Sequence, residues 1–310
     1  MELSIVVPIY NTDLYLEECL DGLYNLKGVT KEVILVNDGS SDRSVDIIQQ
    51  YQKKFPKITT VINKENGGVS SARNAGLEVV KGEYTYFIDS DDYINSKLFE
   101  ELFNTAKKSG LEIITGRGEK FKGNTTNILS VSATALEKGA IQGKEFLTAM
   151  FEDSTGKSWD DVPYRPEVWD SIYKTSLLKE NNITFKDGVI YEDELFTPQV
   201  YIAAQKAQLF DIKFYHYRQR EGNITAKPQK ESTSSRLYLA GEVSDTLFKN
   251  KISTVFSNGF LVDWCWKDRN HVNFPLLRKV MRMGSFRAKS CIKCILLCLY
   301  CIKNKFISSS

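Results

Sequence analysis

The sequence lacks the features of a nucleic-acid-binding or a membrane-spanning protein. Its 310 residues carry 41 basic and 39 acidic side chains, and a net charge of +2 argues against binding to nucleic acid. No run of about 18 apolar residues occurs, so we expect no transmembrane helix. The start, MELSIVVPIYN, has no basic stretch before its short apolar run and does not resemble a signal peptide. We therefore expect a cytoplasmic protein.

The chain also lacks the glycine motifs of two common nucleotide-binding folds. Neither GxGxxG nor GxxxxGK[ST] occurs, which argues against a nicotinamide or flavin enzyme and against a P-loop enzyme. There are only two histidines, and six cysteines. Without an export signal, we expect these cysteines to be reduced thiols rather than disulfides.

What the chain does have is 42% hydrophobic residues, enough for a sizeable core, and a regular alternation of patterns over residues 1–115. Short apolar runs predict strands at 3–10, 31–38, 58–63, 83–89 and 111–116. Amphipathic stretches predict helices at 12–26, 41–55, 69–82 and 96–110. This order predicts an α/β fold with a mostly parallel central sheet flanked by helices.

The remaining chain is less regular. We expect a loop at 116–127, a helix at 168–182, a helix at 189–207 that opens at its acidic end, and a strand at 207–220. After about residue 226 the pattern is helical and more basic. The sequence therefore suggests three parts: residues 1–115, residues 116–225, and a helical extension at 226–310.

Polar clusters follow the first four predicted strands, where parallel sheets bind their ligands. The last cluster, Asp89-Ser-Asp-Asp92, holds three carboxylates in four residues. A turn and helix cap is the simple alternative, but Asn95 and Ser96 already offer a cap. Clustered carboxylates are costly without a cation, and an all-oxygen set suits Mg²⁺ or Mn²⁺, which could bridge a diphosphate.

Three other motifs each have a structural and a functional interpretation. Asp38 in VNDGSSD serves either turn chemistry or hydrogen bonding to a nucleotide's base or ribose. Arg73 in NGGVSSARNAG is either a solvated helix residue or a buried cation near Asp38 or a phosphate. The acids of YEDELF, residues 191–196, either favour the helix dipole or supply a general base.

A fourth motif lies on the predicted strand at 207–220. His216, Arg218 and Arg220 alternate there and lie on one face. That face is either structural or contacts phosphates and a metal.

Taken in order, these motifs resemble the family 2 glycosyltransferases with a GT-A fold, the inverting enzymes of bacterial capsule, lipopolysaccharide and other cell-surface polysaccharide synthesis. The resemblance covers about residues 3–225, from SIVVPIYN to YHYRQREGNIT. It implies a UDP-sugar donor, a glycan or lipid-linked saccharide acceptor, and Mn²⁺ or Mg²⁺ as the cofactor.

The resemblance also implies a set of site residues. Asp193 would be the catalytic base, with Glu192 beside it. The metal would be held by Asp91, Asp89 and His216. The nucleotide-sugar-binding residues would be Pro8, Tyr10, Asn11, Asp38, Asn66, Gly67, Arg73, Asp89, Ser90, His216 and Arg218.

Two positions depart from the family's usual pattern. Ser171 stands in WDSIY where a lysine is common, and Asn223 stands in EGNIT where a serine is common. Neither departure removes an expected acid. A sugar nucleotidyltransferase and a non-catalytic nucleotide-sugar-binding scaffold are the alternatives. A sugar nucleotidyltransferase normally has a Gly-rich, basic N-terminal loop, and VVPIYNTD is neither. The intact acids argue against a non-catalytic scaffold.

The C-terminal stretch 278–306 is basic and then apolar. Cys291, Cys294, Cys298 and Cys301 are spaced by three, four and three residues, which places them on one helix face. Packing of small apolar side chains is the first interpretation. Contact with a membrane surface is the second, because apolar residues widen that face and basic residues flank it. A metal site is the third.

Overall fold

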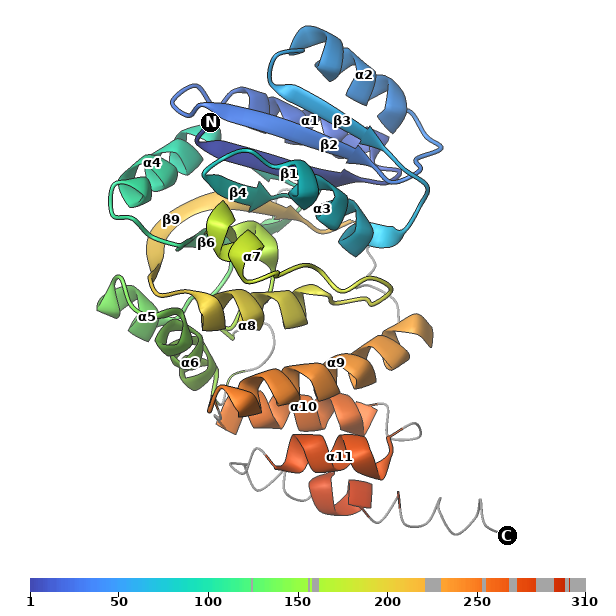
Figure 1. Cartoon of the computed structure of the whole chain (residues 1–310), viewed down its shortest axis with the longest axis vertical. Helices are drawn as coiled ribbons and strands as arrows, with labels where there is room; N and C mark the ends of the chain where they lie inside the picture. Colours follow the sequence, from blue (N-terminus) through green and yellow to red (C-terminus); the bar gives the residue numbers. More distant parts are fainter. Residues whose placement is uncertain are drawn as a thin grey trace.

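The structure is a computed structural model that describes residues 1–123, 125–155, 157, 162–220, 230–252, 255–267, 272–282, 293–298 and 301. These residues form one mixed β-sheet covered by helices on both faces, with further helices at one end (Figure 1). The strands are β1 Leu3–Ile9, β2 Lys31–Asn37, β3 Thr59–Asn63, β4 Tyr84–Phe87, β5 Tyr93–Ile94, β6 Ile113–Lys122, β7 Thr125–Ile128, β8 Ser171–Lys174 and β9 Ala207–Arg218. The helices are α1 Asp13–Tyr24, α2 Ser44–Lys54, α3 Gly68–Val79, α4 Ser96–Lys107, α5 Ala133–Lys138, α6 Gly143–Ser154, the 3₁₀ helix η1 Val168–Asp170, α7 Thr175–Glu180, α8 Asp193–Ala203, α9 Lys230–Lys249, α10 Val255–Lys267 and α11 Phe274–Met281.

The sheet has the strand order β3-β2-β1-β4-β8-β6-β9-β5, with β7 paired to β6. The first four strands in that order are parallel, as the sequence predicts. Strand β8 then pairs antiparallel with both β4 and β6, while β6 and β9 are parallel. Because β8 joins β4 to β6, the stretches 1–115 and 116–225 share one sheet.

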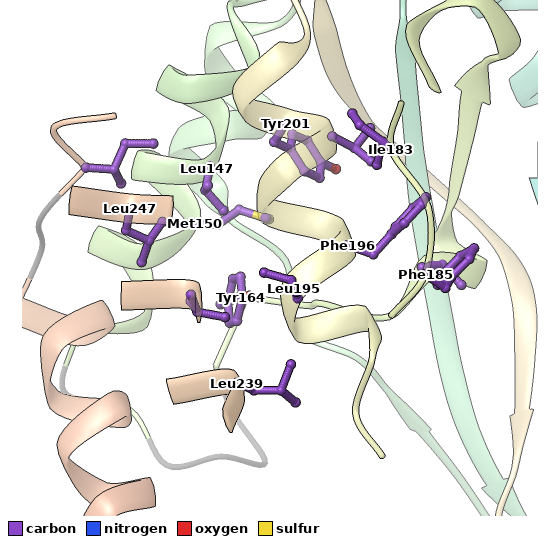
Figure 2. Packing of buried hydrophobic residues seen from close by; sticks show 14 of the residues in the cluster. Leu147, Met150, Tyr164, Ile183, Phe185, Leu195, Phe196, Tyr201, Leu239 and Leu247 are labelled. Atoms are coloured by element: carbon purple, nitrogen blue, oxygen red, sulfur yellow. The ribbon is translucent and has the colours of Figure 1, made fainter. Parts of the chain in front are cut away.

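Alternation along the central strands divides the core in two. Ile5 and Val7 of β1 face a layer built with α1, α2 and α4, whereas Val6 faces a layer that contains residues of α3 and α8. The second layer continues into the C-terminal helices, since Leu239 of α9 packs in the same cluster as Leu195 of α8 (Figure 2). The helices α9 to α11 therefore extend the core of the sheet domain at the end farthest from α2 (Figure 1).

Two predicted elements differ in the structure. Residues 168–182 form η1, β8 and α7 rather than one helix, because β8 fills the place between β4 and β6 and buries Ile172 and Tyr173. The predicted loop at 116–127 is a strand hairpin of β6 and β7. Its glycines make room for rings: a Cβ on Gly116 would lie 2.5 Å from the ring of Phe214.

The four cysteines of the C-terminal series fall partly within the described residues. Residues 293–298 are helical, and Cys294 and Cys301 are buried in the main core cluster. This supports packing as their role, while Cys291 lies outside the described residues. In the part of the chain described by the structure, no helix has both the length and the apolar character to span a bilayer.

Candidate active site

The predicted site residues gather at the carboxyl ends of β1, β2 and β4. Pro8 is buried in β1, and Tyr10 beside it is 51% exposed. Asn11 has a left-handed backbone (φ 51°), and its side-chain oxygen accepts a hydrogen bond from the Ser41 amide at 2.8 Å. The loops after β1 and β2 are thereby joined, and they leave an exposed aromatic ring at the edge of the sheet.

Asp38 is a buried acid of this edge, at 2% exposure. Its carboxylate accepts hydrogen bonds from the amides of Gly67 and Gly68, at 3.0 and 2.8 Å, where α3 begins. Lys64 adds an ion pair at 2.6 Å, and Asn66 donates its side-chain amide to the Asp38 carbonyl. The sequence did not identify Lys64, which follows β3 directly and is the cation that binds Asp38.

Arg73 is buried, and its ion-pair partners are acids other than Asp38. Its guanidinium is buried and forms ion pairs with Asp89, at 2.7 Å, and with Glu192. Burial alone would lower the pKa of Arg73, but the charges of Asp89 and Glu192 raise it overall. Arg73 therefore joins the loop after β4 to the start of α8 rather than bracing Asp38.

The three acids of the loop after β4 have different environments. The Asp89 side chain is 29% exposed. Asp91 accepts a hydrogen bond from Nε of Arg220 at 2.7 Å, and burial and then the charge of Asp89 raise its pKa. Asp92 is buried and accepts hydrogen bonds from the Tyr215 hydroxyl and the Arg218 amide, both at 2.6 Å. Asp92 is thus a structural acid, and Asp89 and Asp91 lie nearer the ligand edge.

Ser90 and the side chains of β9 complete the loop. The Ser90 hydroxyl is buried and accepts a hydrogen bond from Thr12 at 3.0 Å. Arg218 donates its Nε to the Asp91 carbonyl at 2.9 Å and lies over the rings of Tyr15 and Phe121. Arg220 therefore pairs with an acid of this loop, whereas Arg218 bonds to its backbone and forms its ion pair with Glu18.

His216 lies on the same strand but has other partners. Its Nδ1 is 2.8 Å from Oε1 of Glu119, and its ring stacks on Tyr93 at 4.4 Å. Burial lowers its pKa. Within the described residues, no group of three or more His, Cys, Asp or Glu side chains is placed to hold a metal. Asp89, Asp91 and His216 are thus not assembled as one ligand cluster, and their joint metal role stays a prediction.

The acids at the start of α8 lie across Arg73 from this loop. Glu192 is bound to Arg73, and Asp193 is the first residue of the helix, where its Oδ1 accepts a hydrogen bond from the Glu194 amide at 3.0 Å. Burial, then the charges of Glu192 and Glu167, raise the pKa of Asp193 well above its usual range. A carboxyl with a raised pKa accepts a proton more readily than an exposed one. The departure at Asn223 lies outside the described residues.

Comparison with known proteins gives a consistent result. The model of "Glycosyl transferase family 2" matches residues 4–162. The chain is 31% identical to the uncharacterized glycosyltransferase EpsJ of Bacillus subtilis, over 76% of this chain and 66% of that protein. It is 34% identical to a poly(ribitol-phosphate) beta-glucosyltransferase of Bacillus spizizenii, over 72% of this chain and 33% of that protein. The chain therefore spans two thirds or less of the length of these curated relatives.

A solved structure shows the same fold. The crystal structure of residues 1–349 of Staphylococcus aureus TarS with UDP-GlcNAc superimposes with a TM-score of 0.66 at 21% identity, covering 91% of this chain and 79% of that one. This likeness, together with the family match, confirms the predicted GT-A-like α/β fold.

Proposed function

Because the chain belongs to glycosyl transferase family 2, we propose that it is an inverting glycosyltransferase in cell-surface polysaccharide synthesis. It moves a sugar from a UDP-sugar to a hydroxyl of a glycan or a lipid-linked saccharide. The observation that carries the proposal is the Arg73 bridge, which holds Asp89 of the donor loop and Glu192 beside Asp193 on one guanidinium. The donor loop and the base are thus adjacent.

The donor would bind along the edge formed by β1, β2 and β4. Tyr10 offers an exposed ring for the base, and Asp38 offers a carboxylate that the α3 amides hold in place. The TarS neighbour, crystallised with UDP-GlcNAc, supports a uridine nucleotide as the donor. The donor sugar itself is left to experiment.

The loop after β4 suits a divalent cation. Asp89 and Asp91 each use one carboxylate oxygen to bind an arginine. Burial and then the charge of Asp89 raise the pKa of Asp91, so a bound cation would stabilise its ionised form. Two carboxylates with substrate phosphates form a usual Mg²⁺ or Mn²⁺ site. When bound there, the metal would neutralise charge on the departing diphosphate.

The residues of the chain would then carry out a direct displacement. Asp193 takes the proton of the acceptor hydroxyl, and the oxygen attacks the anomeric carbon on the face opposite UDP. The bond from that carbon to the diphosphate breaks, and its electron pair leaves with UDP. The configuration at the anomeric carbon inverts. Arg218 and Arg220 both contact Asp91, which supports a role for the two guanidinium groups in binding the diphosphate.

The test is Asp193→Asn. We expect transfer, measured as UDP release from a panel of UDP-sugars with Mn²⁺ and an acceptor mixture, to fall about 10²- to 10⁴-fold, the usual contribution of a general base. UDP affinity with Mn²⁺ should stay unchanged, because the proposed role of Asp193 concerns the acceptor hydroxyl and not the nucleotide. Asp46→Asn on the exposed face of α2 is the control. Undiminished turnover in Asp193→Asn would rule out its role as the base.

The C-terminal helices favour contact with an anionic membrane surface. Residues 278–310 contain eight basic side chains and no acidic one. Ile295 and Leu296 are 59% and 43% exposed, and Arg278 and Arg282 line a neighbouring cavity of about 820 Å³ with Met281. Exposed apolar side chains bordered by cations are typical of peripheral membrane contact. Such a surface would keep the enzyme near a lipid-linked acceptor.

A further inference from the structure

A second polar pair lies near Asp193, and the catalytic assignment does not use it. The guanidinium of Arg165 is 9% exposed, and its Nε and Nη2 have no hydrogen-bond partner among the described residues. Its Nη1 lies 3.9 Å from Oε1 of Glu167, too far for a hydrogen bond. Oε2 of Glu167 also lacks a partner. Two opposite charges thus lie side by side with unused hydrogen-bonding groups.

Such unused groups are rare inside folded proteins, because each costs about 1–3 kcal/mol and a charged one more. They are retained where another molecule completes their hydrogen bonds. Ordered water is the alternative, and it would make the pair purely structural. The surroundings of Arg165 therefore decide which role fits.

The backbone on both sides of Arg165 is fixed to neighbouring helices. The Tyr164 amide donates to the Ser154 hydroxyl at the end of α6, and the Tyr164 hydroxyl donates to Glu194 of α8. The Thr197 hydroxyl of α8 donates to the Pro166 carbonyl. Figure 2 shows Tyr164 against α8 beside Leu195. Arg165 is thus held on the helix that begins with Asp193.

The same segment reaches the loop after β4. Two residues past Glu167, the Trp169 ring stacks on Tyr215 at 4.1 Å, and the Tyr215 hydroxyl donates to Asp92. Within the same segment, the charge of Glu167 contributes to the raised pKa of Asp193. The pair therefore belongs to a segment that contacts both the helix beginning with Asp193 and the strand that binds the acid loop.

The charges nearby select the chemistry of the ligand. A phosphate would satisfy Arg165 but would be repelled by Glu167 and by the acids at the start of α8. A hydroxyl group instead accepts a hydrogen bond from a guanidinium and donates one to a carboxylate. Two neighbouring hydroxyls match the two free nitrogens of the arginine fork. A neutral polyol or sugar therefore fits this pair better than an anion.

We propose that Arg165 and Glu167 form an acceptor subsite that binds two neighbouring hydroxyl groups of a neutral sugar or polyol unit and presents a further hydroxyl to Asp193. This inference rests on the proposed function, since it concerns the acceptor of that reaction. Arg165 and Glu167 are positioning residues here, because neither touches the reacting oxygen.

The first experiment separates acceptor binding from donor binding in the full chain. Ribitol and methyl β-D-glucoside serve as acceptor probes, and UDP release without a probe measures hydrolysis of the donor. We expect Arg165→Met to raise the KM for the probe about 10- to 100-fold, the equivalent of lost hydrogen bonds to a charged group. Hydrolysis and UDP affinity should not change. Equal losses in hydrolysis and transfer would make the pair structural and overturn the proposal.

Two conservative variants guard against misfolding. Arg165→Lys keeps the charge without the fork, and Glu167→Gln keeps the shape without the charge. Both should raise the KM for the probe less than Arg165→Met, with kcat nearly retained. Lys53→Met, at an exposed position of α2, is the control and should behave as wild type. A KM unchanged in all the Arg165 and Glu167 variants would refute the subsite.

A second measurement does not depend on the donor. Saturation-transfer NMR with the full chain should detect ribitol or methyl β-D-glucoside bound to wild type and no binding to Arg165→Met. If wild type neither binds UDP nor hydrolyses any UDP-sugar, the proposed function fails while this measurement still tests the subsite. Equal polyol signals in both proteins would overturn the proposal. Tighter binding of glycerol 3-phosphate than of glycerol would also overturn it, in favour of an anion site.

Discussion

Arg73 pairs with Asp89 after β4 and with Glu192 beside the proposed base, so its removal gives the sharpest test of the proposed site. We predict that Arg73→Met lowers the free energy of unfolding by about 3–5 kcal/mol, as expected when one partner of a buried ion pair is removed. The guanidinium is 5% exposed at the side chain, so water cannot replace it without a rearrangement.

The magnitude follows from the two acids that would lose their partner. The Glu192 side chain is 9% exposed, so most of the cost comes from leaving this carboxylate uncompensated. The Asp89 side chain is 29% exposed and can be hydrated, so its share stays below about 1 kcal/mol. The cation also lies 5.1 Å from the Phe185 ring, a contact that contributes about 0.5–1 kcal/mol.

The assay is urea unfolding of wild type, Arg73→Met, Glu192→Gln and the double variant. If the cost arises from an unpaired Glu192, the double variant should recover about 2 kcal/mol relative to Arg73→Met, as coupled neighbours do. Arg73→Lys, which keeps the charge, should lose less than Arg73→Met. Additive effects of the two single changes, or a loss below about 1 kcal/mol for Arg73→Met, would refute the reasoning.

Three further predictions concern other parts of the fold. Burial raises the pKa of Asp170 to about 8. Between pH 5 and pH 8 the folded chain therefore holds a proton that the unfolded chain has released, and the free energy of unfolding should fall by about 1 kcal/mol per pH unit. Asp170→Asn should remove that slope in urea titrations. A Cβ on Gly143 would lie 2.0 Å from the Tyr201 carbonyl, whereas one on Gly241 in α9 would meet its nearest neighbour at 3.4 Å. Gly143→Ala should therefore destabilise the folded protein by about 1–3 kcal/mol. Gly241→Ala should stabilise it by about 0.5–1 kcal/mol, and urea unfolding measures both. Replacing Ile295 and Leu296 together by aspartate should abolish co-sedimentation of the full chain with phosphatidylglycerol vesicles while leaving UDP binding intact, and unchanged co-sedimentation would refute membrane contact through this helix.

Much of the fold could be predicted where local pattern and tertiary environment agree. The segments that became β1, β2 and β4 are apolar throughout because helices cover both faces of a parallel sheet. Helix α4 begins after Asn95, the cap that the sequence offered, and the Asn95 side chain accepts a hydrogen bond from the Leu98 amide. In these segments the hydrophobic pattern and the cap residues predicted the same elements that the sheet contains.

The errors arise where distant pairing overrides local pattern. Ile172 and Tyr173 lie in a stretch with helical spacing, but they form a strand because hydrogen-bonded pairing with β4 on one side and β6 on the other stabilises it. Gly116 indicated a loop, yet it is needed inside β6 because Phe214 occupies the space of a side chain. Neither neighbour is close in sequence, so no local pattern could identify it.

The same limit applies to the site. The residue types and their order identified Asp38, Asp89 and Asp193 as candidates, because carboxylates at strand ends and helix starts have recognisable chemistry. Their partners could not be predicted. Arg73 bonds to Glu192 across 119 positions of sequence, and the buried pair of Arg165 and Glu167 lies in a stretch where the sequence suggested little chemistry.

The three acids after β4 show why the site needs both stretches that share the sheet. Asp92 is stabilised by the Tyr215 hydroxyl and the Arg218 amide, and Asp91 by the Arg220 guanidinium, all from β9 or the residues after it. The stretch 1–115 supplies the acids but not these donors. Without β9, the buried carboxylate of Asp92 and the half-buried one of Asp91 would lie close together with no compensation, and the loop could not keep this shape. The shape of this acid loop is therefore produced by the second stretch of the sheet, although the acids themselves belong to the first.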